Sequence, residues 1–286
     1  MTKFNTELDA LFAGKAQLPT LPDLLLQVQR ALANEMGGLD ELARIIERDP
    51  GLAAKLLRVA NSAAFSRGIQ VTAISAAVGR LGLKQVRSLC MAVGVVRAFD
   101  NTNRTLDHAR YWEHSAAVGL VAERLAQASK RNAQVDGAEA YVAGLLHDVG
   151  LLLLDQFFPE DFAAILEETD AEMTGSWRIE LQRIGLDHGE IGGRLLTHWG
   201  VPQGVISAVT HHHHPDEGPE LAGPIGQLVW GAEALCSACG LALSAEGTAE
   251  VAPHDVLERL GVPPETRDEL IAEVGDIGDR ARQFTT

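Results

Sequence analysis

The histidines have the clearest capacity for chemistry in this chain, because they gather in one stretch of the sequence. Seven of the ten form four groups between residues 114 and 214: His114, the pair His147-Asp148, His188, and the run from His211 to His214. Imidazole nitrogens and carboxylate oxygens together suit Zn, Fe, Mn or Ni, whereas calcium prefers oxygen ligands alone. The pattern therefore predicts a pocket for a divalent transition metal.

Asp148 is the acidic member of this set. The pair His147-Asp148 lies in the segment AGLLHDVG, where an otherwise apolar helix carries two adjacent polar side chains. A buried carboxylate is costly unless a cation, a hydrogen-bond donor or a metal ion lies beside it. A metal site meets that need, and so does a purely structural hydrogen bond between His147 and Asp148.

The other histidines also have plain structural explanations when each is taken alone. His114 is explained as an ordinary half-buried side chain, and His188 as a residue that caps a helix start. The run from His211 is explained as a solvated helix end, where histidine is favourable near the negative pole of the dipole. Only the ordered set of histidines points specifically to a metal pocket.

Helices must position these groups, because the composition favours an all-helical fold. Apolar residues make up 46% of the chain and aromatic residues 5%, with Leu and Ala abundant, whereas sheets prefer β-branched and aromatic side chains. Short helices are expected early, for example at Asp23 to Ala33, and longer ones later, with Asp136 to Gln156 as a single helix. The polar stretch Asp100 to Asp107 is the expected boundary between the two parts.

The charge and the cysteines restrict the partners and the compartment. Asp and Glu outnumber Lys and Arg by 39 to 24, so the net charge of -15 disfavours a nucleic-acid partner. Apolar runs such as Val149 to Leu154 are shorter than the roughly 18 residues of a membrane span. With three cysteines and no secretory leader, the expected location is the cytoplasm. Cys236 and Cys239 have redox or zinc spacing, but they are interpreted as small buried helix residues.

Several ordered motifs resemble one known family. They are LPTLPDLLLQV, RDPGLAAKLLRVANSAAFS, AISAAVGRLGLKQVRSLCMA, YWEHSAAVG, GLLHDVGLLLL and DHGEIGGRLLTHWGVP leading into HHHHP. Together they resemble the HDOD (HD-related output domain) family, within the HD and HD-GYP superfamily of metal-dependent phosphohydrolases. The resemblance covers roughly residues 15 to 240.

The resemblance implies an all-α fold, in which an N-terminal helical subdomain packs against an HD-type multi-helix domain. The implied organisation is an N-terminal segment, the helical subdomain, the HD-like domain, and a C-terminal loop with helices, at residues 1–14, 15–100, 107–240 and 241–286. It also implies metal ligands at His114, His147, Asp148, His188, His212 and His213. HD enzymes close the site with a late acidic residue, usually Asp. The matching residue here is Glu233, one methylene longer, so its ability to act as a ligand is left open.

The resemblance leaves two functions open. After the paired histidines the chain continues PDEGPE instead of the glycine-tyrosine-proline signature of cyclic di-GMP phosphodiesterases, and Arg110 stands where those enzymes carry an acid. We therefore expect a regulatory output module that acts in trans on signalling proteins of receiver, kinase or cyclase type. No organic cofactor is expected. The alternative is a phosphohydrolase acting on a nucleotide or other phosphate ester, in which the ligands hold one or two metal ions, Asp148 belongs to the catalytic centre and the metal activates water.

Overall fold

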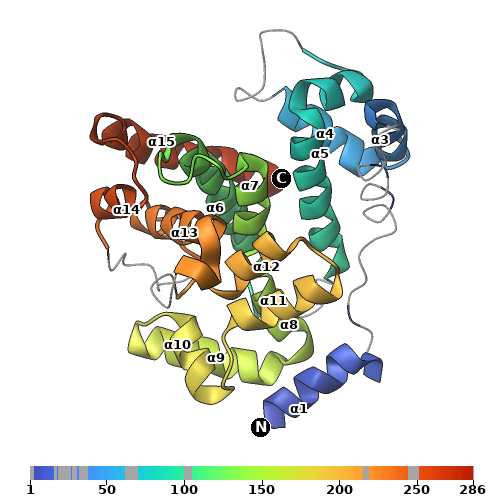
Figure 1. Ribbon diagram of the computed structural model, residues 1–286. Helices are drawn as coiled ribbons and strands as arrows, with labels where there is room; N and C mark the ends of the chain where they lie inside the picture. Colours follow the sequence, from blue (N-terminus) through green and yellow to red (C-terminus); the bar gives the residue numbers. More distant parts are fainter. Residues whose placement is uncertain are drawn as a thin grey trace. The chain divides into compact units, whose positions relative to one another are not determined.

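Helices make up the regular structure of this protein. The computed structural model describes residues 3–15, 18, 27, 31, 38–61, 70–99, 105–214, 219–243 and 251–285, and no strand occurs within these ranges (Figure 1). The expected all-helical class is therefore confirmed. The helix expected at Asp23 to Ala33 lies almost entirely outside the described residues. The chain divides into two compact units, one of Pro19–Ala98 and one that combines Met1–Leu18 with Phe99–Thr286.

The unit of Pro19–Ala98 contains three described helices, α3 (Gly38–Glu47), α4 (Pro50–Ala60) and α5 (Ile74–Ala98). The Asp49 carboxylate accepts the backbone N–H of Leu52 at 3.0 Å, so it caps the start of α4, where proline suits the first turn. The Asn61 side chain then exchanges two hydrogen bonds of 2.8 Å with the backbone of Val71. Polar side chains thus define where these helices end and begin.

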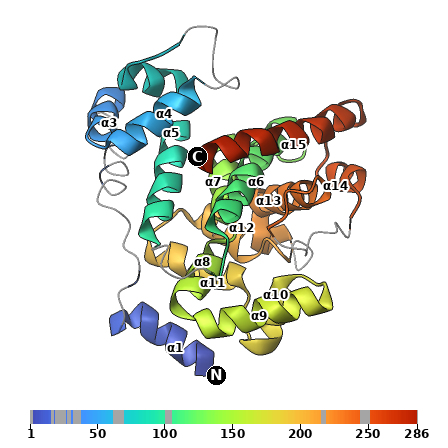
Figure 2. The same ribbon diagram turned by 180° about the vertical axis from the view of Figure 1, so that it is seen from behind.

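The larger unit is built around α6, which packs against α7, α13 and α15 (Figures 1 and 2). Its buried face includes Tyr111, Val118, Val121 and Leu125. The helical elements of this unit are α1 (Lys3–Ala10), a short π-helical turn (Leu11–Lys15), α6 (His108–Ala128), α7 (Gly137–Leu146), α8 (Val149–Phe157), α9 (Pro159–Glu172), α10 (Ser176–Arg183), α11 (His188–His198), α12 (Gln203–Thr210), α13 (Pro219–Ala238), α14 (Pro253–Arg259) and α15 (Pro264–Thr285).

The first helix belongs to this larger unit although it lies far from it in sequence. Phe4 contacts Phe158 with ring centroids 4.6 Å apart, and Arg194 donates a hydrogen bond to the Asp9 carboxylate at 3.1 Å. These contacts place α1 beside the end of α8 and the middle of α11. The N-terminal residues therefore help to hold elements that come more than 140 residues later.

Two glycines let α6 and α7 approach closely. A Cβ on Gly144 would lie 2.9 Å from the Cα of Gly119, and a Cβ on Gly119 would lie 2.9 Å from the carbonyl oxygen of Tyr141. Neither position tolerates a side chain without movement of backbone. This close crossing brings the start of α6, which carries His114, toward the end of α7, where His147 follows.

The expected single helix from Asp136 to Gln156 is in fact two, because the chain turns at His147 and Asp148 between α7 and α8. Asp148 occupies the N-cap position of α8 with φ -95° and ψ 11°, but its side chain accepts no capping hydrogen bond. The carboxylate is therefore free to face another group. The apolar run Gly137–Phe157 is long enough to cross a membrane, but 83% of its most apolar window is buried inside the unit, so it forms core.

Gly150 sets the distance between α8 and α11. A Cβ at this position would lie 2.0 Å from the carbonyl oxygen of His188 and 3.0 Å from the backbone nitrogen of Gly192. Because backbone atoms cannot swing aside as a flexible side chain can, only glycine fits between the two helices.

We expect Gly150→Ala to lower the free energy of unfolding by about 3 kcal/mol through overpacking. The matched control is Gly275→Ala in α15, where nothing lies within 4 Å of the new Cβ. That variant should be neutral or slightly stabilising, because alanine is the better helix former. Thermal and urea unfolding followed by circular dichroism measure both effects. Equal stability of the two variants would show that the backbones of α8 and α11 leave room for a Cβ at residue 150.

Candidate metal centre

Seven residues from five separate places in the chain meet at one point of the larger unit. They form three overlapping groups, and within each group the potential ligand atoms all lie within 4.8 Å of one another. The groups are Asp148 with His188, His212 and His213; His114 with His147 and Asp148; and His147 with His212 and Glu233. The structure therefore brings together every residue that the sequence suggested as a ligand, including Glu233.

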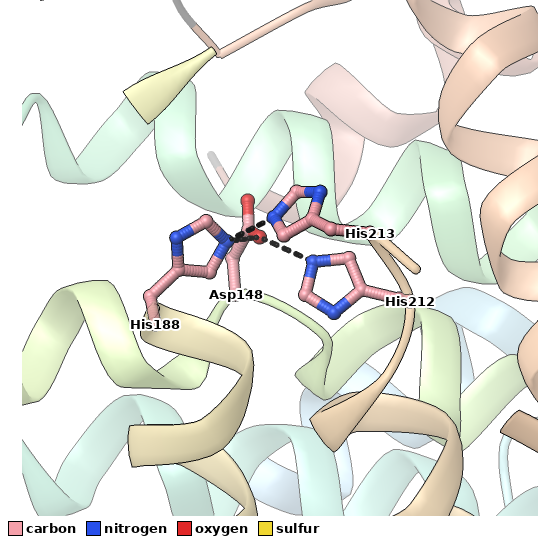
Figure 3. A group of neighbouring side chains, drawn as sticks. All are labelled: Asp148, His188, His212 and His213. Atoms are coloured by element: carbon pink, nitrogen blue, oxygen red, sulfur yellow. Dashed lines mark hydrogen bonds and ion pairs between the residues drawn. The ribbon is translucent and has the colours of Figure 1, made fainter. Parts of the chain in front are cut away.

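Different elements supply these side chains. His114 comes from α6, Glu233 from α13, and His188 is the first residue of α11. His212 and His213 lie in the turn after α12, and His147 and Asp148 form the break between α7 and α8. Figure 3 shows Asp148 between the imidazoles of His188, His212 and His213. The site is made of helix ends and turns rather than of one helix face.

Asp148 is the centre of the cluster. Its Oδ1 lies 3.1 Å from Nε2 of His147 and 3.1 Å from Nε2 of His188. The same oxygen lies 3.6 Å from Nε2 of His212, and Oδ2 lies 3.7 Å from Nε2 of His114. Nε2 of His213 is 2.8 Å from Nε2 of His188. The Nε2 atoms of all five imidazoles thus converge on one carboxylate.

The other ring nitrogen of four of these histidines is held by the protein. Nδ1 lies 2.7 Å from a backbone carbonyl oxygen in three of them, which belong to Leu241 for His114, Gly144 for His147 and Val209 for His212. A carbonyl can only accept, so each Nδ1 must carry the proton, and the lone pair of the neutral ring is on Nε2. Each Nε2 therefore presents a lone pair toward the centre, as metal-binding histidines do.

Glu180 performs the same role for His188, and the sequence did not point to it. The Nδ1 of His188 lies 2.9 Å from both carboxylate oxygens of Glu180, and the backbone N–H of His188 donates to that carboxylate at 2.5 Å. Glu180 is 0% exposed. A fully buried carboxylate with two donors from a single residue fixes both the ring and the start of α11.

Two buried nitrogens test whether the pocket suits a metal ion. Nε2 of His147 and Nε2 of His212 are buried and make no hydrogen bond, although both lie within 4 Å of Asp148. Buried ring nitrogens are normally satisfied, and an unsatisfied one calls for an explanation. Nitrogen and oxygen donors together suit Zn, Fe, Mn or Ni. A metal ion would satisfy both nitrogens, so the residues present fit the ion that the pattern implies.

The pKa values of the clustered residues shift in different directions. Burial lowers the pKa of His188, but the charges of Glu180 and Asp148 outweigh it and hold that pKa well above its usual range. Burial raises the pKa of Asp148, yet the surrounding imidazoles bring it well below normal. Burial and the neighbouring His212 lower the pKa of His213 strongly, and burial with His147 lowers that of His114. Burial lowers the pKa of His147, but the charge of Asp148 outweighs it and raises that pKa. His114, His213 and Asp148 therefore favour the protonation states that metal ligands need, whereas His147 and His188 would release a proton when an ion binds.

Trp177, near the start of α10, packs against the edge of the cluster. Its indole is stacked on His213 with ring centroids 5.6 Å apart and planes at 19°, and it meets His214 edge-on at 5.0 Å. The guanidinium of Arg178 lies 4.8 Å from the indole centroid. One short helix therefore carries both the indole beside His213 and the carboxylate that holds His188.

The cysteines take no part in the cluster. Cys90, Cys236 and Cys239 are all free thiols, and burial raises the pKa of the Cys90 thiol to about 12. Burial also raises the pKa values of Cys236 and Cys239. Neither reactive thiolates nor a disulfide follow from such environments. Cys236 is buried in α13, as the sequence interpretation expected, whereas Cys239 lies in the turn after that helix and is half-buried.

A cavity of about 470 Å³ opens onto one side of the cluster. Five of the seven candidate ligands line it, namely His114, Asp148, His188, His213 and Glu233. The remaining lining comes from the segment before α6 and its first turn, from α8, from the hairpin of α9 and α10, and from α13 with the residues after it. A bound ion would thus be accessible to a small molecule.

Known proteins share this architecture. A crystal structure of an HDOD domain protein of unknown function from Geobacter sulfurreducens is 26% identical and superposes with a TM-score of 0.79, covering 98% of this chain and 96% of that one. A protein from Marinobacter aquaeolei proposed to act in signal transduction is 26% identical with a TM-score of 0.76, over 100% of this chain and 62% of the other.

A relative from Treponema pallidum, which bears the name uncharacterized protein, is 30% identical over 221 residues. That match covers 77% of this chain but 42% of the relative, so this chain spans less than half the length of that protein. The HDOD domain matches residues 18–215, which contain six of the seven clustered residues. This chain belongs to the HDOD domain family.

Proposed function

We propose that this chain is a cytoplasmic signal-transduction output module, whose HD pocket binds a divalent transition metal ion as part of its working structure. The observation that carries the metal site is the arrangement of the histidine rings. Four rings donate Nδ1–H to protein acceptors, and their Nε2 atoms face Asp148. If the pocket only contained a structural hydrogen bond between His147 and Asp148, one oriented ring would be enough, whereas four are present.

The signalling role is supported by the family and by the Marinobacter relative, which this chain covers only in part. A regulatory output module acts on the proteins that it binds. We therefore propose protein partners of receiver, kinase or cyclase type. The candidate ligands are His114, His147, Asp148, His188, His212, His213 and Glu233, and Zn, Fe, Mn or Ni fits their donor atoms. Because Asp148 and His147 each belong to more than one group, the pocket suits one ion or two that share ligands.

A second candidate function is hydrolysis of a phosphate ester, and the cavity favours it, because Asp148, His188 and His213 line it together. When bound, a divalent ion supplies Lewis-acid polarisation and activates water. Metal-loaded protein should then hydrolyse 4-nitrophenyl phosphate or bis(4-nitrophenyl) phosphate. Turnover that is lost with His147→Ala/Asp148→Ala would support an enzyme. Metal-loaded protein without turnover would leave the regulatory role.

The metal site itself is tested by elemental analysis of untagged protein. We expect a near-stoichiometric transition metal in the wild type, and its loss in the variant His147→Ala/Asp148→Ala. The control is His254→Ala, because His254 is exposed and its ion pair with Asp268, at 3.2 Å, involves no residue of the cluster. Chelation should also lower the thermal midpoint of the wild type, since a ligand that binds the folded state stabilises it. Wild-type protein that stays metal-free after incubation with each metal would contradict the proposal.

Glu180 should orient His188 for the metal. Removal of such a partner typically weakens metal affinity by about 10–100-fold, and we expect that loss for Glu180→Ala. Glu180→Gln keeps an oxygen acceptor for Nδ1–H and should recover part of the affinity. Glu167→Ala, an exposed position on α9, is the matched control. Competition with a metal chelator measures the three affinities.

The stability of the metal-free proteins separates this role from simple packing. A merely structural Glu180 would lower the thermal midpoint of metal-free protein and leave the metal affinity of the folded fraction unchanged. Unchanged affinity in Glu180→Ala would therefore contradict an orienting role, whatever its stability.

A further inference from the structure

The cavity beside the cluster has two kinds of wall. One kind consists of polar groups of the cluster, among them Asp148 and His188. The other kind consists of apolar side chains from four different segments: Leu106, Leu151, Phe162, Leu166 and Leu243. A volume of about 470 Å³ lies in the range of small-molecule sites rather than of single waters.

The charges of the lining select against a polyanion. Among the described lining residues, Arg110 is the single Arg or Lys, and its guanidinium already donates to the carbonyl oxygen of Ala242 at 3.1 Å. Two exposed carboxylates that do not belong to the candidate ligands, Asp107 and Asp170, line the same cavity. An anionic group is therefore favourable only at the metal end, where the ion reverses the local charge. A second anionic group toward the carboxylates would be repelled.

The aromatic side chains of the lining are already packed against other groups of the protein. The indole of Trp177 has His213 stacked on it, with the Arg178 guanidinium also over the ring, and Phe162 is 0% exposed. Stacking of a base needs an open aromatic face. The apolar contacts that remain are mainly leucine side chains, which fit an aliphatic group better than a flat heterocycle.

We propose that this cavity binds a small amphiphilic ligand, with one anionic head group at the metal and an aliphatic body along the leucine-lined wall. The head is a carboxylate or a phosphate monoester, which share the oxygen donors that coordinate a metal ion. This inference rests on the proposed metal site, because without the ion the cavity is lined by four carboxylates. Such a ligand would be the signal that the module senses.

The binding test uses the full chain loaded with zinc and freed of excess metal, studied by calorimetry. The probes are hexanoate, acetate and hexanedioate for one head group, and hexyl phosphate and inorganic phosphate for the other. Buried methylene groups should make hexanoate bind at least about tenfold more tightly than acetate, or hexyl phosphate at least about tenfold more tightly than inorganic phosphate. The pair of probes that shows this gain in affinity identifies the head group. Hexanedioate should bind at least about tenfold more weakly than hexanoate, because its second carboxylate meets Asp107 and Asp170.

Two pairs of variants locate the binding site. Leu166→Trp fills the cavity from α9 and should weaken the better six-carbon probe at least about tenfold, with zinc content unchanged. Ala163→Trp, at an exposed position on the same helix outside the cavity, should leave the affinity unchanged. Asp170→Asn should reduce the difference in affinity between hexanoate and hexanedioate. The control Glu167→Gln should leave that difference unchanged.

The outcomes separate this inference from the proposed function. Zinc-loaded protein that binds neither six-carbon probe better than its short analogue overturns the amphiphile proposal and leaves the metal site intact. Equal binding of hexanedioate and hexanoate overturns the charge argument for a single head group. Failure to take up zinc, iron, manganese or nickel overturns the proposed metal site and, with it, the head-group anchor.

Discussion

Asp148 is 4% exposed, and a carboxylate charge at that depth is tolerated only among several oriented partners. It receives them because the chain breaks between α7 and α8 at this residue. His147 keeps helical dihedral angles (φ -55°, ψ -39°), and the chain departs from the helix at Asp148 (ψ 11°). Both side chains lie in one pocket, and the carboxylate of Asp148 is not used as a helix cap. The rest of the larger unit is arranged so that five imidazoles reach this oxygen pair.

That arrangement depends on close backbone packing. Gly119 and Gly144 let α6 approach α7, and Gly150 lets α8 approach α11, so two helix pairs cross at distances that a Cβ would prevent. The capping box at the start of α11, with Asp187 accepting from the N–H of Glu190 at 2.8 Å, fixes the first turn that carries His188. His214 bonds the same Asp187 at 3.1 Å, which ties the turn after α12 to α11. Ring positions in the cluster therefore depend both on close backbone packing and on buried side-chain hydrogen bonds.

Much of this could be predicted from the sequence, and the part that could not has physical causes. The candidate ligands could be predicted because histidine in apolar surroundings is unusual. The order of these residues along the chain also resembles that of a known family. The break at His147 was missed because AGLLHDVG has neither proline nor the glycine position that usually ends a helix. Glu180 was missed because WRIELQR reads as an ordinary polar helix, and its burial arises only from tertiary packing. The membership of α1 in the larger unit depends on contacts such as Phe4 with Phe158, which no local pattern encodes.

The position of α10 joins the two properties proposed for the pocket. This eight-residue helix carries Glu180, which holds His188, and Trp177, which lies on His213 and lines the cavity. If a ligand in the cavity displaces α10, the hydrogen bond at Nδ1 of His188 must change, and the affinity of that ring for a metal changes with it. Linkage is reciprocal, so the ion must alter the affinity for the ligand by the same factor. A sensor needs such a coupling between the binding of its signal and the state of its metal site. In this pocket α10 alone can provide that coupling.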